Sequence, residues 1–159
     1  MDVAALILWI LTAGGGFVLL WTWLAKGGAR SDGPGSRFPV PLIFGHFALA
    51  AIGLVLWIVY VATDTTGIGW TAFVLLLVVA VLGFTMFARW VPTLLASRRA
   101  GEADPSVYGA SAPGTVTPEQ TAATAARTAE SHFPVPIVLG HGVLAATTLV
   151  LVVIALATG

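Results

Sequence analysis

Two stretches of the chain each place one histidine in an apolar run, and they are the first candidates for chemistry. Residues 36–49 read SRFPVPLIFGHFAL, and residues 131–144 read SHFPVPIVLGHGVL. His46 and His141 occupy the same position in the two stretches, five residues after the second proline. An ionisable residue at membrane depth indicates a functional site by default. The recurrence predicts that the two histidines act together.

A pair of imidazoles limits the cofactors that could bind. Neither stretch contains a thiol or a carboxylate, and a closed zinc site takes four ligands. Two imidazoles do complete the axial pair of a haem b, whose macrocycle supplies the other four nitrogens. The pattern resembles the bis-histidine haem helices of membrane b-type cytochromes, although those cytochromes generally carry four histidines for two haems. The sequence therefore predicts one haem b, ligated by His46 and His141.

Small residues beside each histidine would leave room for a flat porphyrin. The residue four places on lies on the same helix face, and it is alanine in both copies. The glycine directly before each histidine permits close approach of another backbone. The predicted cofactor-binding residues are His46, His141, Gly45, Gly140, Ala50 and Ala145, with the two histidines as metal ligands.

Other interpretations of the same histidines stay open. Small residues and a polar side chain are also typical of ordinary helix packing in membranes, and proton handling or another metal would use the same groups. The predicted function is a b-type cytochrome that relays electrons for a quinone or a respiratory complex. The alternative is a cofactor-free structural or accessory subunit. A transporter ranks lower because the chain offers almost no polar path, and the sequence supports no soluble-type enzyme because it provides no nucleophile, base and orienting group.

The composition places these residues in a membrane. Hydrophobic residues make up 58% of the chain and charged residues 9%, against about 25% charged in soluble domains. Four stretches, 3–25, 40–63, 68–92 and 134–158, reach the roughly 20 apolar residues that span a bilayer as helix. An all-α membrane protein with four transmembrane helices is expected. The absence of cysteine excludes covalent c-type haem, and zero net charge argues against nucleic acid.

The basic residues predict the orientation. All seven lie between the first and second spans or from the end of the third span to the fourth: Lys26, Arg30, Arg37, Arg89, Arg98, Arg99 and Arg127. The positive-inside rule then puts both linkers in the cytoplasm and both termini outside the plasma membrane. Trp21, Trp23 and Trp90 are expected at the cytoplasmic interface and Trp70 at the outer one.

An internal repeat predicts the architecture. Residues 36–63 and 131–158 share fifteen identities in twenty-eight positions. A weaker match, at an offset of 67, relates Gly16, Phe17 and Trp23 to Gly83, Phe84 and Trp90. We expect two tandem, parallel helical hairpins related by a pseudo-two-fold axis along the membrane normal. The first is 1–66, and the second is 67–159 with a cytoplasmic linker at about 93–132.

The shared Phe-Pro-Val-Pro motif is interpreted structurally. Proline is tolerated in the first turn of a helix, where its missing N–H has no partner in any case. The motif should therefore fix where the second and fourth spans begin, with Phe38 and Phe133 anchored at the lipid headgroups. In the second linker, Thr117 as cap and Pro118 at the first helical position predict a short helix over 117–130.

Overall fold

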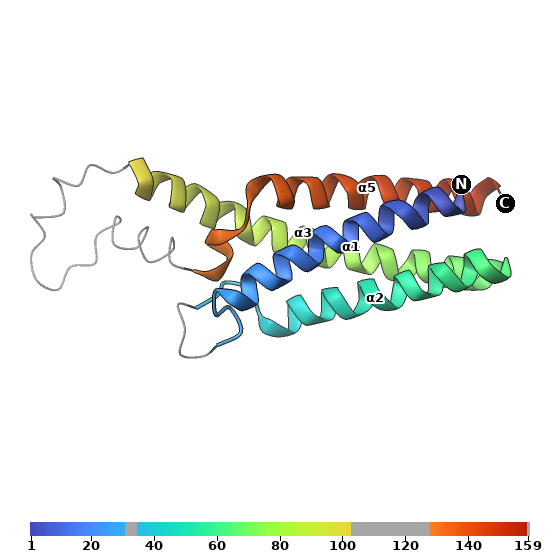
Figure 1. Ribbon diagram of the computed structural model, residues 1–159, viewed down its shortest axis with the longest axis horizontal. Helices are drawn as coiled ribbons and strands as arrows, with labels where there is room; N and C mark the ends of the chain where they lie inside the picture. The colour runs from blue at the N-terminus through green and yellow to red at the C-terminus, as the bar shows by residue number, and fades with distance from the viewer. Residues whose placement is uncertain (31–34, 103–127, 159) are drawn as a thin grey trace, which may run out of the picture.

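The computed structural model describes residues 1–30, 35–102 and 128–158, and four long helices that alternate in direction form a bundle (Figure 1). They are α1 (Asp2–Ala25), α2 (Val40–Thr63), α3 (Thr66–Glu102) and α5 (Val135–Thr158). A short 3₁₀ helix, η2 (Ala129–His132), precedes α5. Each long helix contains a segment long and apolar enough to cross a bilayer. The described part of the chain is all-helical, and its four long apolar helices indicate a membrane-embedded protein.

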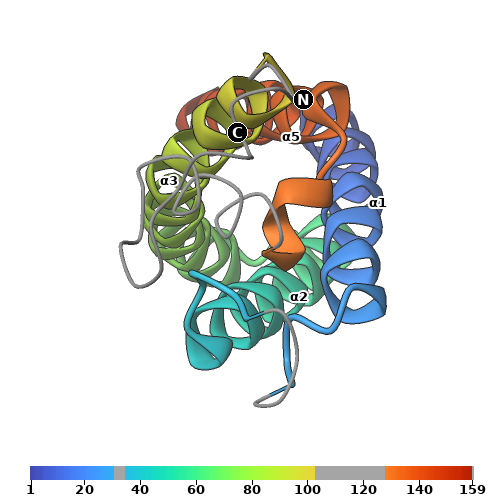
Figure 2. The ribbon, with the colours of Figure 1, turned by 90° about the vertical axis from the view of Figure 1, so that its left-hand side faces the viewer.

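The four helices form a ring in the order α1, α2, α3, α5 (Figure 2). The most extensive contacts join α1 to α5 and α2 to α3. As a result α2 and α5 face each other across the bundle. We call the end that holds both termini and the turn between α2 and α3 the terminal end, and the opposite end the linker end (Figure 1).

The proline motifs begin the helices that carry the histidines, as the sequence predicts. Pro39 caps α2 and Pro41 lies in its first turn. The helix α5 begins directly after Pro134, with Pro136 at its second position. Ser36 Oγ accepts a hydrogen bond from the backbone N–H of Phe38 at 3.0 Å, which closes the turn into α2.

The third helix is longer than predicted. The apolar run ends at residue 92, but α3 continues to Glu102 through Pro92. The residues after this proline, TLLASRRAGE, include leucine, alanine and arginine, which favour helix strongly without being uniformly apolar. The first ten residues of the expected 93–132 linker are therefore helical. The helix predicted over 117–130 lies outside the described residues up to position 127.

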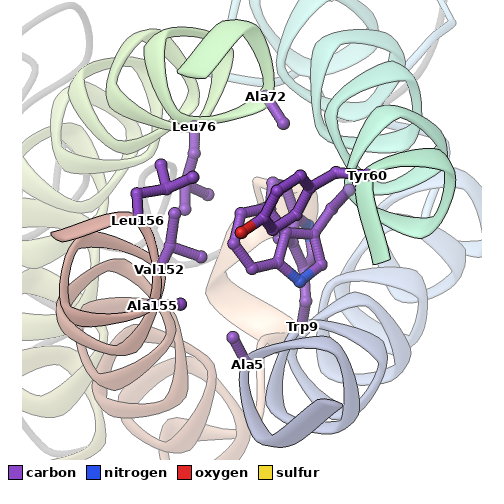
Figure 3. Packing of buried hydrophobic residues seen from close by; sticks show 9 residues of the cluster. Ala5, Trp9, Tyr60, Ala72, Leu76, Val152, Ala155 and Leu156 are labelled. Atoms are coloured by element: carbon purple, nitrogen blue, oxygen red, sulfur yellow. The ribbon is translucent and has the colours of Figure 1, made fainter. Parts of the chain in front are cut away.

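The buried core is divided into two clusters. The terminal cluster comprises Ala5, Trp9, Trp57, Tyr60, Ala72, Leu76, Val152, Ala155 and Leu156. Figure 3 shows Trp9 and Tyr60 in its centre, between small and aliphatic side chains of the other helices. The linker cluster comprises Trp23, Phe38, Ile43, Trp90 and Ala129. His46 and His141 belong to neither cluster.

Three aromatic residues expected at the membrane surface pack inside the bundle instead. Trp23 is fully buried and donates to Ser36 Oγ at 2.9 Å, and Trp90 donates to the backbone oxygen of Glu130 at 3.2 Å. Phe38 is buried against Phe133, with ring centroids 6.1 Å apart. Indole N–H groups need a partner when they are buried; Glu130 in η2 and Ser36 before α2 supply it.

Candidate functional site

The two predicted ligands meet in the interior of the bundle. His46 projects from α2 and His141 from α5, and their ring centroids lie 6.4 Å apart with ring planes inclined by 61°. Both side chains are half-buried. Histidines from diagonally opposite helices therefore face each other in the gap between the two core clusters.

Each imidazole is oriented by a backbone carbonyl of a neighbouring helix. His46 Nδ1 lies 3.1 Å from the oxygen of Val79 on α3, and His141 Nδ1 lies 2.9 Å from the oxygen of Thr12 on α1. Because a carbonyl only accepts, Nδ1 donates the hydrogen bond in both rings, and in the neutral form of each ring Nε2 then presents a lone pair. Neither Nε2 has a hydrogen-bond partner within the described parts of the chain. Metal-binding histidines use this same arrangement, in which the non-ligating N–H is held by a carbonyl.

Glycines on α1 and α3 lie directly against the imidazole rings. A Cβ added at Gly16 would lie 3.0 Å from Cε1 of His141, and one at Gly83 would lie 3.1 Å from Cε1 of His46. Gly15 also borders His141, with a Cβ position 3.6 Å from its ring. A Cβ at position 16 or 83 would require the neighbouring imidazole to shift by a few tenths of an ångström.

The glycines next to the histidines have no such neighbours. A Cβ at Gly45 or Gly140 would meet no described atom within 4 Å, so the close approach expected there occurs on α1 and α3 instead. The reason is geometric: a residue adjacent to an inward-facing histidine is rotated by about 100° around the helix. The repeat that relates Gly16 to Gly83 was the signal in the sequence for this close approach.

Burial changes along the helix faces that carry the two histidines. Ala50 and Ala145 share the helix faces of the histidines, yet both are only half-buried. Three residues further along those faces, Gly53 and Thr148 are buried. The small side chains at 50 and 145 are thus partly exposed.

A protein-only metal site is not formed by the described residues. No group of three or more His, Cys, Asp or Glu side chains among them could hold a metal ion. An iron at the histidine pair would need four further nitrogens from a macrocycle. No protein-family profile, curated protein or solved structure matches the chain.

Proposed function

We propose that the protein is a small integral membrane b-type cytochrome that binds one haem b between α2 and α5. His46 and His141 would hold the haem iron through their Nε2 atoms. When bound, the haem would provide one-electron chemistry. The chain would then serve as an electron relay for a quinone or for a subunit of a respiratory complex.

The separation of the two rings is the observation that carries the proposal. An imidazole nitrogen that binds a metal lies about 2.0 Å from it, so two rings that would hold the same metal must lie close together. The centroids of His46 and His141 are 6.4 Å apart. The 61° between the ring planes is compatible with this arrangement, because each ring can rotate about its own metal–nitrogen bond.

The protonation state of the rings supports the same function. Both Nδ1 atoms donate hydrogen bonds to carbonyls. In a neutral ring, the lone pair of Nε2 is then available to bind a metal. A buried nitrogen without a partner is otherwise a cost in an apolar interior.

The proposal includes a duplicated architecture, with hairpins 1–66 and 67–159 related by a pseudo-two-fold axis along the membrane normal. The contacts of the two histidines support it. The carbonyl acceptors Thr12 and Val79 are 67 residues apart, the same interval that separates Gly16 from Gly83. Each histidine thus contacts matching positions on the first helix of the other hairpin.

We further propose that the protein lies in the plasma membrane with its linker end in the cytoplasm and both termini outside. Lys26, Arg30, Arg37 and Arg89 are exposed at or near the linker end, and positive charge of this kind favours the cytoplasmic side.

An absorption spectrum of the detergent-purified protein, expressed with ample haem supply, tests the function. A Soret band that shifts on reduction by dithionite is expected, with one haem per chain by pyridine haemochrome assay. A colourless protein would contradict the proposal. It would favour the cofactor-free accessory subunit, in which the two Nδ1–carbonyl hydrogen bonds serve only to join helices.

A further inference from the structure

Two exposed arginines meet at the linker end, where α2 begins beside α3. The guanidinium of Arg89 on α3 donates to the backbone oxygen of Arg37, from Nε at 3.0 Å and from Nη2 at 2.7 Å. The backbone N–H of Arg37 donates to Oε1 of the buried Glu130 at 2.6 Å. The main chain of Arg37 is therefore held by η2 on one side and by α3 on the other, which fixes two cationic residues next to each other.

Both guanidinium groups have N–H donors left for a ligand. An arginine side chain carries five N–H donors, and in Arg89 only the Nε–H and one N–H of Nη2 are used on Arg37. Among the side chains that the structure describes, no carboxylate pairs with either guanidinium, because the buried Glu130 bonds to the main chain of Arg37 instead. The two side chains can thus bind an anion together.

The length of α3 places Arg89 at the level of the lipid headgroups. Arg89 lies 23 residues after Thr66, the first residue of α3, which is about 35 Å at 1.5 Å per residue. The hydrocarbon core of a bilayer is about 30 Å thick, and the headgroup layers bring the total to about 40–45 Å. With Thr66 at the opposite surface, Arg89 and the adjoining Arg37 lie just beyond the hydrocarbon. Arg98 and Arg99 lie about 14–15 Å further along α3.

Apolar side chains continue from the two arginines toward the membrane interior. Val40 and Phe44 follow Arg37 on α2, Phe87 precedes Arg89 on α3, and all three are exposed. A molecule held at the arginines would place its apolar part against this surface. Positive charge at headgroup level above an exposed apolar surface matches an amphipathic anion.

We propose that Arg37 and Arg89 form a binding site for the phosphate headgroup of an anionic phospholipid in the leaflet at the linker end. Guanidinium groups bind phosphate through paired N–H donors. Two of them together favour a lipid with net negative charge over a zwitterionic lipid, whose headgroup adds a cation. The acyl chains lie along the apolar side chains of α2 and α3. This inference does not rest on haem binding or on which leaflet faces the cytoplasm.

Native mass spectrometry of the full chain in a neutral detergent tests the site. With phosphatidylglycerol and phosphatidylcholine added in equal amounts, adducts of the anionic lipid should exceed those of the zwitterionic lipid several-fold. Arg37→Gln and Arg89→Gln should each lower the phosphatidylglycerol adducts several-fold. An excess of inorganic phosphate should leave these adducts in place, because it lacks the apolar part. Equal adducts of the two lipids, or displacement by inorganic phosphate, would overturn the proposal.

Two matched controls separate this site from the overall positive charge of the linker end. Arg98→Gln removes the same charge from the same helix beyond the headgroup layer, and Lys26→Gln removes one charge after α1, the helix diagonal to α3 (Figure 2). Both variants should keep wild-type levels of phosphatidylglycerol adducts. A loss as large in the controls as in Arg89→Gln would mean that net charge alone attracts the lipid, which would contradict the proposed site.

Thermal unfolding in detergent gives a second readout. A ligand that binds the folded state raises the midpoint of unfolding, so phosphatidylglycerol should raise it for the wild type and for Arg98→Gln but not for Arg89→Gln. Arg89→Lys keeps the charge and loses the paired donors that hold Arg37, so its shift should be smaller than that of the wild type. An unchanged shift in both Arg89 variants would overturn the assignment of the site to this arginine.

Discussion

Gly16 lies so close to His141 that a methyl group at position 16 would come within 3.0 Å of the ring carbon Cε1. The opposite pair, Gly83 and His46, has nearly the same geometry, with a distance of 3.1 Å. Contacts this short are tighter than ordinary van der Waals contact, so a side chain at either position would require the imidazole to move by a few tenths of an ångström. The position of each imidazole therefore depends on the absence of a side chain on the neighbouring helix.

The first prediction follows from this contact. Gly16→Ala and Gly83→Ala should each displace an imidazole and lower the haem content of the purified protein several-fold. Gly14→Ala is the matched control on the same helix, because a Cβ there meets no described atom within 4 Å. It should keep its haem and be neutral or stabilising by up to about 1 kcal/mol, since alanine favours helix over glycine. Haem content and thermal unfolding in detergent are the measurements. Equal haem content in the three variants would show that the glycines do not position the ligands.

The second prediction concerns the ligands themselves. His46→Ala and His141→Ala should each remove the haem or leave it five-coordinate, and the damage should be similar because the two rings have matching contacts. His132→Ala should keep the wild-type spectrum, because this residue is exposed in η2 and lies before the start of α5. The reduced-minus-oxidised spectrum of each variant is the measurement. Wild-type spectra for both His46→Ala and His141→Ala would show that the histidines serve only in helix packing.

Much of the fold could be predicted, because a helix that crosses a bilayer needs about 20 apolar residues and such runs can be found in the sequence. The starts of α2 and α5 followed from the repeated prolines. The end of α3 could not be found in this way, since the helix continues past Pro92 on residues that are good helix formers but not apolar. The burial of Trp23 was also missed, because tryptophan is common both at membrane interfaces and in cores, and only its contact with Ser36 decides between them.

The site was partly predictable for a related reason. His46 and His141 were conspicuous because a polar side chain in an apolar run is rare. Their hydrogen-bond acceptors are the backbone oxygens of Thr12 and Val79, and a backbone acceptor leaves no trace in residue type. The buried Glu130 was missed because it lies in a polar linker, where glutamate is ordinary.

The third prediction tests the space beside the imidazoles. Ala50→Leu and Ala145→Leu add volume to the half-buried layer around His46 and His141, so haem retention should fall. Val55→Leu is the matched control, since this side chain is 58% exposed on the outer face of α2 and would extend into lipid. Haem content after purification is the measurement. Full retention in the two alanine variants would mean that the cofactor does not occupy this layer.

The last prediction concerns orientation. A single cysteine can be placed at either end of the bundle, because the wild-type chain has none. Thr65 lies in the turn between α2 and α3 at the terminal end, and Ala29 lies after α1 at the linker end; both are exposed. If the basic residues hold the linker end in the cytoplasm, a membrane-impermeant maleimide applied to intact cells should label Thr65→Cys and not Ala29→Cys. Permeabilised cells provide the control, in which both positions should react. Labelling of Ala29→Cys alone in intact cells would reverse the orientation.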